Sequence, residues 1–172
     1  MALGDWGWNE DWAGRLRSVG QEPASPARVS SQARTLWTIP TEHGPRQARI
    51  PASGLSDGLP AVGDWVVAAS GDVEDDPWII RAILPRRSKF SRQAVGDRSE
   101  EQIVAANVDR VWLVNGLDLE LNARRIERYL AVAWESGAQP EIVLAKADIA
   151  VDLDKARSLV AEVALGIPVW RP

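Results

Sequence analysis

The chain changes its sequence pattern near Asn107, and this change constrains the fold more than any other feature. Between residues 28 and 84, short apolar runs are interrupted by turn residues such as Ser56-Asp57-Gly58. After Asn107, longer apolar runs alternate with stretches that have helical periodicity. The first pattern is typical of small all-β folds and the second of parallel α/β units, so the sequence predicts two structural parts.

The first part is predicted to be a small β-barrel. Candidate strands lie at about residues 27–31, 34–40, 46–51, 64–69 and 77–84. Five short strands in this space fit an OB-fold, the five-stranded barrel that commonly binds oligonucleotides. The composition equally allows an SH3-like barrel. The loop from Gly71 to Asp76 is acidic and would repel a phosphate backbone, so RNA would have to meet another face of the barrel.

A short amphipathic helix is predicted before the barrel, over about Asp5 to Val19. Its evidence is the helical spacing of the apolar residues Trp8, Trp12, Leu16 and Val19. Asp11 and Gly14 have the D-x-x-G spacing of a GTPase switch, but they fall inside this helix and we interpret the match as coincidence. The chain contains nine tryptophans, which we expect to serve mainly in core packing.

The second part is predicted to alternate strand and helix. The near-continuous apolar run from Val108 to Asn115 predicts a strand buried on both faces. Asn122 can cap a helix that ends at Gly137, and Asp152 can cap a second helix that stops at Gly166. Apolar runs at 141–144 and 167–170 complete a strand–helix–strand–helix–strand order, which indicates parallel α/β units.

The composition limits the classes of function. The net charge of −4 argues against broad affinity for nucleic acid, because such affinity needs many cations that face phosphates. The absence of cysteine excludes disulfides and thiolate metal sites and fits a reducing cytoplasm. The single histidine, His43, cannot form a zinc site and is expected in a loop. No apolar run approaches the ~18 residues of a membrane span.

Positive charge is nevertheless concentrated in one segment between the two parts. Its cations are opposed locally only by Asp97, and they are Arg81, Arg86, Arg87, Lys89, Arg92 and Arg98. A basic patch on an otherwise acidic protein can contact RNA phosphates. The alternative is a solvated linker, and the residues alone do not decide between the two.

One loop motif could carry chemistry. Ala145-Lys146-Ala147-Asp148 follows the predicted strand at 141–144, and ligands of parallel sheets bind at the carboxyl ends of strands. The spacing resembles the N/T-K-x-D element that recognises guanine. There the aspartate accepts hydrogen bonds from the ring N–H and the exocyclic amine, and the lysine stem lies along the base. Ala145 cannot make the side-chain hydrogen bonds of the usual first residue. The alternative is an ordinary loop that leads into a helix.

Four longer stretches resemble one known family. They are VGDWV at 62–66, PRRSKFSR at 85–92, QIVAANVDRVWLV at 102–114 and RRIERYLAVAWESGAQPEIVLAKAD at 124–148. Together they are similar to the RsgA (YjeQ) family of small-subunit ribosome biogenesis GTPases, whose G domain is circularly permuted. The resemblance implies an amino-terminal helix and loop (1–26), an OB barrel (27–85), a linker (86–106) and part of a permuted GTPase domain (107–172).

The resemblance also implies ligands and partners. Ala145, Lys146 and Asp148 would bind the guanine of GTP or GDP, and the barrel would face the ribosomal RNA of the small subunit in the cytoplasm, the chain being a monomer. The phosphate contacts are then expected from Arg86, Arg87, Lys89 and Arg92. Second candidates on predicted strands are Arg34, Arg46 and Arg49.

The catalytic parts of a GTPase are missing from the sequence given. It contains no G-x-x-x-x-G-K-[ST], and the ligands for the Mg²⁺ and Zn²⁺ of complete family members are also missing. We therefore assign no catalytic residue and expect the 172 residues by themselves not to hydrolyse GTP. The rival hypothesis is a non-enzymatic OB-fold RNA-binding adaptor whose α/β part is only structural.

Overall fold

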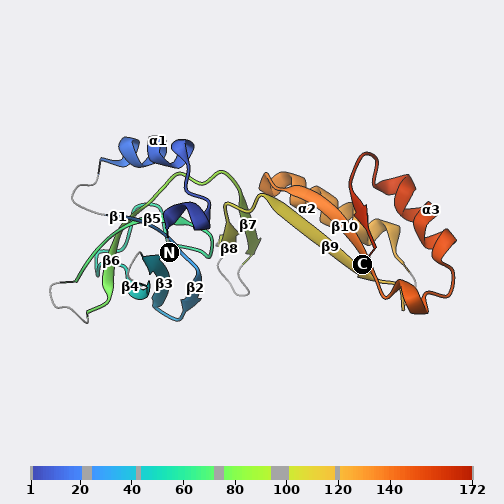
Figure 1. The fold of residues 1–172 in the computed structure, drawn as a ribbon, viewed down its shortest axis with the longest axis horizontal. Coiled ribbons are helices and arrows are strands. Elements are labelled where there is room, and N and C mark those ends of the chain that lie inside the picture. Colours follow the sequence, from blue (N-terminus) through green and yellow to red (C-terminus); the bar gives the residue numbers. More distant parts are fainter. Residues whose placement is uncertain are drawn as a thin grey trace. The chain divides into compact units, whose positions relative to one another are not determined.

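The computed structural model of the chain divides into two compact units, residues 1–107 and 108–172 (Figure 1). The structure describes residues 2–20, 25–41, 44–71, 76–93, 101–118 and 121–171, with the backbone alone at 92, 93 and 101. His43, which was expected in a loop, lies outside the described residues. In the described part of the chain, no helix is long and apolar enough to cross a membrane.

The first unit begins with two short helices rather than one. The 3₁₀ helix η1 spans Leu3–Trp6, and α1 spans Glu10–Val19. Gly7 separates them with a φ of 87°, a left-handed conformation that ends the first turn. Asn9 caps α1 by accepting a hydrogen bond from the Trp12 backbone N–H at 3.2 Å.

A six-stranded sheet follows the helices. In spatial order its strands are β1 (Ser25–Arg28), β5 (Trp65–Ala69), β6 (Trp78–Ile83), β4 (Gly44–Arg49), β3 (Leu36–Thr41) and β2 (Ser31–Ala33). All neighbours are antiparallel except β4 and β6, which are parallel. The predicted strand positions therefore agree closely with the observed ones, but the first predicted strand is split between β1 and β2.

The sheet curls because β1 and β2 are two halves of one bent segment. β1 pairs with β5 at one side of the sheet, and β2 pairs with β3 at the other. Between these halves, the Val29 N–H donates to the Asp64 carbonyl at 2.8 Å and the Ser30 N–H donates to the Thr38 carbonyl at 2.9 Å. Hydrogen bonding thus continues from one side of the sheet to the other around the bend.

Two apolar clusters hold this unit together. One fills the curled sheet with fully buried side chains that include Trp37, Ile39 and Ile80. The other joins α1 to the outside of the sheet through Trp12 and Trp65, whose ring centroids lie 6.0 Å apart. The amino-terminal helix is therefore part of this unit's core.

The segment 86–106 differs from the linker that was expected. It contains β7 (Lys89–Gln93) and β8 (Glu101–Ala106), which pair as an antiparallel hairpin. The Ala106 N–H donates to the Val62 carbonyl at 2.9 Å. The buried amide of Asn107 then accepts from the Arg87 N–H at 2.9 Å and donates to the Gly63 carbonyl at 3.1 Å. These bonds, which charge patterning cannot reveal, attach the segment to the first unit.

The second unit is a three-stranded parallel sheet with helical crossovers. Its elements are β9 (Arg110–Gly116), α2 (Ala123–Ser136), β10 (Gln139–Ala145), the 3₁₀ helix η2 (Ala147–Ile149), α3 (Leu153–Val163) and β11 (Val169–Trp170). β10 lies between β9 and β11. Both helices contribute to one cluster that covers Ile142 and Leu144, and hence one face of the sheet.

The opposite face of this sheet is exposed within the unit. Trp112 and Val114 of β9 are 68% and 63% exposed, and Trp170 of β11 is 55% exposed. The prediction that β9 is buried on both faces is therefore wrong for the structure described. An apolar run is compatible with either situation, because periodicity does not say how many faces of a strand are covered.

Candidate functional site

The loop that follows β10 lies at the carboxyl end of the parallel sheet. Ala145 is the last residue of β10, and Lys146 begins the turn with a left-handed backbone at φ 59° and ψ 36°. Asp148 then lies in η2. A non-glycine residue in this conformation is uncommon and is found most often where the surrounding structure requires it.

The neighbouring loop after β9 contacts this one directly. Ala145 is paired in register with Gly116, and the Leu117 N–H donates to the Ala145 carbonyl at 3.0 Å. The Lys146 ammonium forms an ion pair with the carboxylate of Asp118. The hydrogen bond from Lys146 to this carboxylate lowers the pKa of Asp118 below its ordinary value of 3.8.

Gly116 leaves the space in which this ion pair forms. A Cβ atom at Gly116 would lie 2.5 Å from Asp118 Oδ1 and 3.7 Å from Lys146 Cδ. The lysine stem therefore passes close to the Gly116 backbone on its way to Asp118. A side chain larger than hydrogen at Gly116 would displace Asp118.

Asp148 has the properties required for binding a base. Its side chain is exposed, and it makes no hydrogen bond or ion pair with the residues that the structure describes. A carboxylate in this state can accept two parallel hydrogen bonds from a ring N–H and an adjacent amine. Ala145 presents only a methyl group, so the loop lacks the side-chain donor of the usual motif.

A pocket of about 330 Å³ adjoins this loop pair. Its lining is mostly apolar and comes from the loop after β9 and the beginning of α3: Leu117, Asp118, Leu121, Ala150, Val151, Asp152, Lys155, Ala156 and Leu159. Asp118 belongs both to this lining and to the ion pair with Lys146, whereas neither Lys146 nor Asp148 lines the pocket. The pocket and the K-x-D loop are therefore distinct features that meet at Asp118.

The residues described here do not fit a metal or a phosphate chain. No group of three His, Cys, Asp or Glu side chains that could hold an ion occurs in the described ranges. The sequence also lacks cysteine and a glycine-rich phosphate loop. The D-x-x-G match lies in α1, as expected, and its Asp11 is paired with Arg15 at 3.0 Å.

The structure places Arg86 in a partly buried position, paired with a buried carboxylate, rather than in an open patch. Its Nε and Nη2 atoms donate to the two oxygens of Asp64 at 2.8 and 2.6 Å, and Asp64 is fully buried. Nη2 also reaches the Leu59 carbonyl at 3.2 Å. This bidentate geometry gives Arg86 a structural role, which the sequence pattern did not reveal.

The other predicted cations lie on more exposed positions. Arg87 is exposed and its guanidinium lies 4.7 Å from the centroid of the Trp12 ring, while Lys89 is exposed on β7. Arg92 is also on β7, but its side chain is not described. The second candidates are exposed as well, with Arg34 in the turn between β2 and β3 and with Arg46 and Arg49 on β4.

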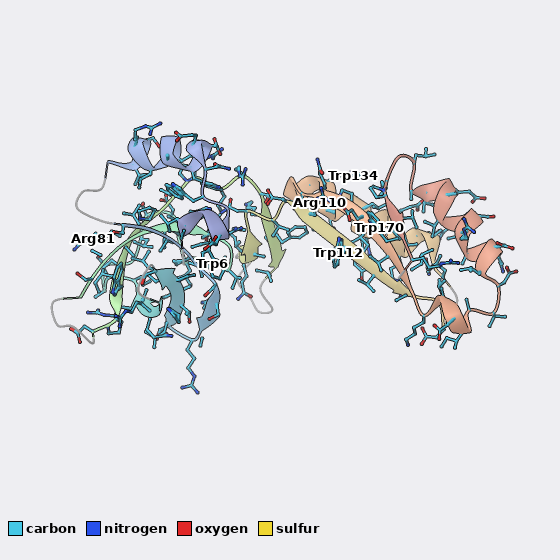
Figure 2. All side chains as sticks on the ribbon, viewed as in Figure 1. Trp6, Arg81, Arg110, Trp112, Trp134 and Trp170 are labelled. Atoms are coloured by element: carbon cyan, nitrogen blue, oxygen red, sulfur yellow. The ribbon has the colours of Figure 1, made fainter. Side chains whose placement is uncertain are left out.

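Sequence reasoning missed a buried carboxylate on the exposed face of the second unit. Glu141 of β10 accepts hydrogen bonds from Trp112 Nε1 at 3.0 Å and Trp170 Nε1 at 2.9 Å, and it pairs with Arg110 at 2.9 Å. Figure 2 shows Arg110, Trp112 and Trp170 on this sheet. The only sequence signal was an acidic residue within an apolar strand.

Comparisons with known proteins agree on one family. The family model described as RsgA GTPase matches residues 83–171. The small ribosomal subunit biogenesis GTPases RsgA of Opitutus terrae and Streptomyces coelicolor are each 40% identical over 98% of this chain. The matches cover 49% and 46% of those relatives, so the chain spans about half of their length.

Solved structures share the fold at lower identity. YloQ, a circularly permuted GTPase, has a TM-score of 0.63 and 18% identity, and the match covers 87% of this chain and 52% of YloQ. YjeQ from Thermotoga maritima has a TM-score of 0.65 and 22% identity, with 86% of this chain and 51% of that protein covered.

Proposed function

The chain belongs to the RsgA GTPase family, and from this premise we propose that it supplies guanine recognition in a circularly permuted GTPase. The Opitutus and Streptomyces relatives are named as small ribosomal subunit biogenesis GTPases. We extend that role to this protein, with the maturing small subunit as its partner and GTP or GDP as its ligand. The site of action is then the cytoplasm, and the protein acts as a monomer.

The observation that carries the proposal is the K-x-D loop at the carboxyl end of β10. Asp148 is exposed and has no partner in the described part of the chain, so its two oxygens can accept from the ring N–H and exocyclic amine of guanine. Adenine offers no such pair of donors. Lys146 can lie along the base because its stem is held beside Gly116.

The proposal limits what the 172 residues do by themselves. Phosphoryl transfer needs positioned phosphates, a metal and an aligned water, which supply most of its rate. The sequence given has no phosphate loop, and the described residues offer no metal site. We therefore expect weak guanine binding and no GTP hydrolysis by this polypeptide.

The first unit is proposed to be an OB barrel that binds ribosomal RNA. When β1 and β2 are counted as one bent strand, the curled sheet has the five strands of that fold. Arg87, Lys89 and Arg92 remain the proposed phosphate contacts, whereas Arg86 is mainly engaged with Asp64. Such contacts orient RNA without reading its sequence.

A second candidate function is favoured by Ala145, which lacks the polar side chain of the usual first motif residue. It is a non-enzymatic RNA-binding adaptor in which the α/β unit is only structural. The adaptor predicts no response to guanosine at any concentration. The GTPase proposal predicts a weak response that is confined to the loops after β9 and β10.

Guanosine titration of the ¹⁵N-labelled chain separates the two candidates. We expect amide shifts at Gly116, Lys146 and Asp148 with guanosine and none with adenosine. Asp148→Asn should abolish the response to guanosine and create one to xanthosine, because the Asn amide can donate to the extra carbonyl of xanthine. The absence of any guanosine response in the wild type would favour the adaptor.

RNA binding is tested by its dependence on salt. The measurement is the affinity of the chain for the small subunit over a range of salt concentrations. Replacing Arg87 and Lys89 by Gln should reduce the slope of log K against log salt by about two, since each phosphate contact contributes nearly one. Replacing the exposed Arg157 and Arg171 by Gln gives a control of equal charge. An unchanged slope in the first variant would remove both residues from the proposed interface.

A further inference from the structure

We infer that Asp118 is the positioning residue of the guanine site. Its ion pair with Lys146, called the clasp below, replaces the hydrogen bonds that Ala145 cannot make. This inference rests on the proposed function, because it concerns the orientation of Lys146 toward guanine. Neither the K-x-D spacing nor the family match assigns a role to Asp118.

The argument begins with what Ala145 removes. In the usual motif, the first side chain forms hydrogen bonds that hold the base and a neighbouring loop. Ala145 has no polar atom, and only its backbone carbonyl links it to the next loop, through the Leu117 N–H at 3.0 Å. Backbone pairing fixes the end of β10 but does not orient the side chain of Lys146.

The clasp supplies that orientation from the neighbouring loop. Asp118 lies two residues after Gly116, the register partner of Ala145, so its carboxylate reaches across to the lysine. The lysine stem is then held at two points, by its backbone and by its ammonium. A stem fixed in this way presents its methylene groups to a base without a further loss of rotamer entropy on binding.

Two features of the local sequence are explained by the clasp. Gly116 leaves room for the ion pair, because a Cβ would lie 2.5 Å from Asp118 Oδ1 and would shift that carboxylate. The left-handed backbone of Lys146, at φ 59°, carries a conformational cost that other contacts must offset. The Leu117–Ala145 hydrogen bond is a contact of that kind, and the ion pair forms from the side-chain direction that this backbone gives.

The clasp should affect binding more than stability. The side chains of Lys146 and Asp118 are 56% and 32% exposed, and pairs at such positions contribute little to folding. A purely structural ion pair would show the reverse behaviour, since its loss would lower stability and leave affinity unchanged. This difference makes the inference testable apart from the fold.

The test compares Asp118→Asn with wild type in the guanosine titration. We expect the guanosine Kd to rise about fivefold, with an unchanged urea midpoint for the second unit. Asp118→Glu, which retains the charge, should recover part of the affinity, and Gly116→Ala should resemble Asp118→Asn. The matched control is Asp154→Asn, which removes an exposed aspartate of α3 and should leave the Kd unchanged.

A double-mutant cycle tests the replacement itself. Ala145→Asn restores the usual first residue of the motif and should lower the guanosine Kd of the wild type. In that background, Asp118→Asn should raise the guanosine Kd by clearly less than the fivefold expected in the wild type. The reason is that the restored Asn side chain still holds the loop when the ion pair is lost. Additive effects would contradict the idea that Asp118 replaces the missing Asn.

The possible outcomes distinguish a failure of this inference from a failure of the proposed function. If wild type binds guanosine, Asp148→Asn switches the base and Asp118→Asn binds like wild type, the inference fails while the guanine site stands. A parallel fall of affinity and urea midpoint in Asp118→Asn would show a merely structural role and overturn the inference. If wild type shows no guanosine response, the proposed function and the inference fail together.

Discussion

The Arg86–Asp64 pair shows how one residue can have a role different from that of its neighbours in a basic cluster. Asp64 is fully buried and accepts from two guanidinium nitrogens and from the Ala61 N–H at 2.8 Å. Such a pair costs desolvation to form, but removing one partner leaves the other charge unsatisfied. Arg86 is therefore expected to matter for the stability of the first unit.

We predict that Asp64→Ala lowers the free energy of unfolding of the first unit by about 3 kcal/mol. The loss arises because the Arg86 guanidinium, which is mostly covered, and the Ala61 N–H both lose the Asp64 carboxylate as an acceptor. Urea denaturation followed by tryptophan fluorescence measures the change. Asp57→Ala, in an exposed turn, is the control, and equal midpoints for the two variants would contradict the prediction.

The Asp118–Lys146 clasp should also have a defined pH dependence. The hydrogen bond from Lys146 holds the pKa of Asp118 below 3.8, so the folded state favours the charged carboxylate. The pair is fully formed above that value, and it is lost as the pH falls through the lower pKa of the folded state. The carboxyl carbon of Asp118 should therefore keep the chemical shift of the charged form as the pH passes 3.8 and titrate only in more acidic solution.

This measurement is read by NMR while the amide signals of α2 remain in place. The side-chain carbon signals of Lys146 should shift together with the titration of the Asp118 carboxyl carbon, because the ion pair is lost at the same pH. Asp118→Asn provides the control, because its Lys146 carbon signals should show no such titration. An Asp118 carboxyl that titrates at 3.8 or above would contradict the pairing.

At the scale of secondary structure, helix ends are set by local chemistry that the sequence displays. The side chain of Asn122 accepts from the Arg125 N–H at 3.1 Å, and Gly137 ends α2 with a left-handed backbone. Both boundaries were predicted from the residue types alone. The same reasoning located the Asp152 cap of α3, which accepts from the Lys155 N–H at 2.9 Å.

We predict that Asn122→Ala costs about 1 kcal/mol in the unfolding of the second unit. The reason is the loss of the Asn122 side-chain oxygen, which accepts a hydrogen bond from the Arg125 N–H at the start of α2. Urea denaturation of the chain measures this change in the free energy of unfolding. Asn122→Asp keeps the acceptor and serves as the control, and an equal loss in both variants would argue against a capping role.

Elements that depend on distant contacts were harder to predict. The hairpin of β7 and β8 was predicted to be a linker between the two parts of the chain, whereas its attachment to the first unit depends on Asn107 and Gly63. The bend that divides β1 from β2 depends on hydrogen bonds from Val29 and Ser30 to two different strands. No local propensity indicates either feature.

On the exposed face of the second sheet, we expect one carboxylate to fix the orientation of two indole rings. Glu141 accepts both indole N–H groups, from Trp112 and Trp170. In Glu141→Ala, the indole NMR signals of these two tryptophans should move to solvent-like positions and exchange faster, since water becomes their acceptor. Glu135→Ala on the exposed side of α2 is the control. Unchanged indole signals in Glu141→Ala would mean that the carboxylate does not order them.

For the whole molecule, the sequence pattern indicated two parts and the structure has two compact units, with the division at residue 107. The motif residues Lys146 and Asp148 were identified from spacing because their chemistry is local to one loop. Asp118 could not be identified in this way, since its relation to Lys146 depends on the register of β9 against β10. Register of this kind becomes visible only in three dimensions.

The two units should differ in stability because they bury apolar surface differently. The first unit encloses the interior of a curled sheet and packs a helix on its outside, so Trp12, Trp37 and Trp65 are almost completely buried. The second has one covered sheet face, with Trp112 and Val114 exposed on the other. Less burial of apolar area for each ordered residue leaves a smaller surplus over conformational entropy.

Hydrogen exchange tests this difference directly. We predict that the most protected amides of β10 exchange at least about 100-fold faster than those of β5, which corresponds to a gap of roughly 3 kcal/mol in opening free energy. β10 is the central strand of its sheet, so edge fraying does not account for such a gap. Equal protection in both strands would mean that the exposed face costs the second unit little.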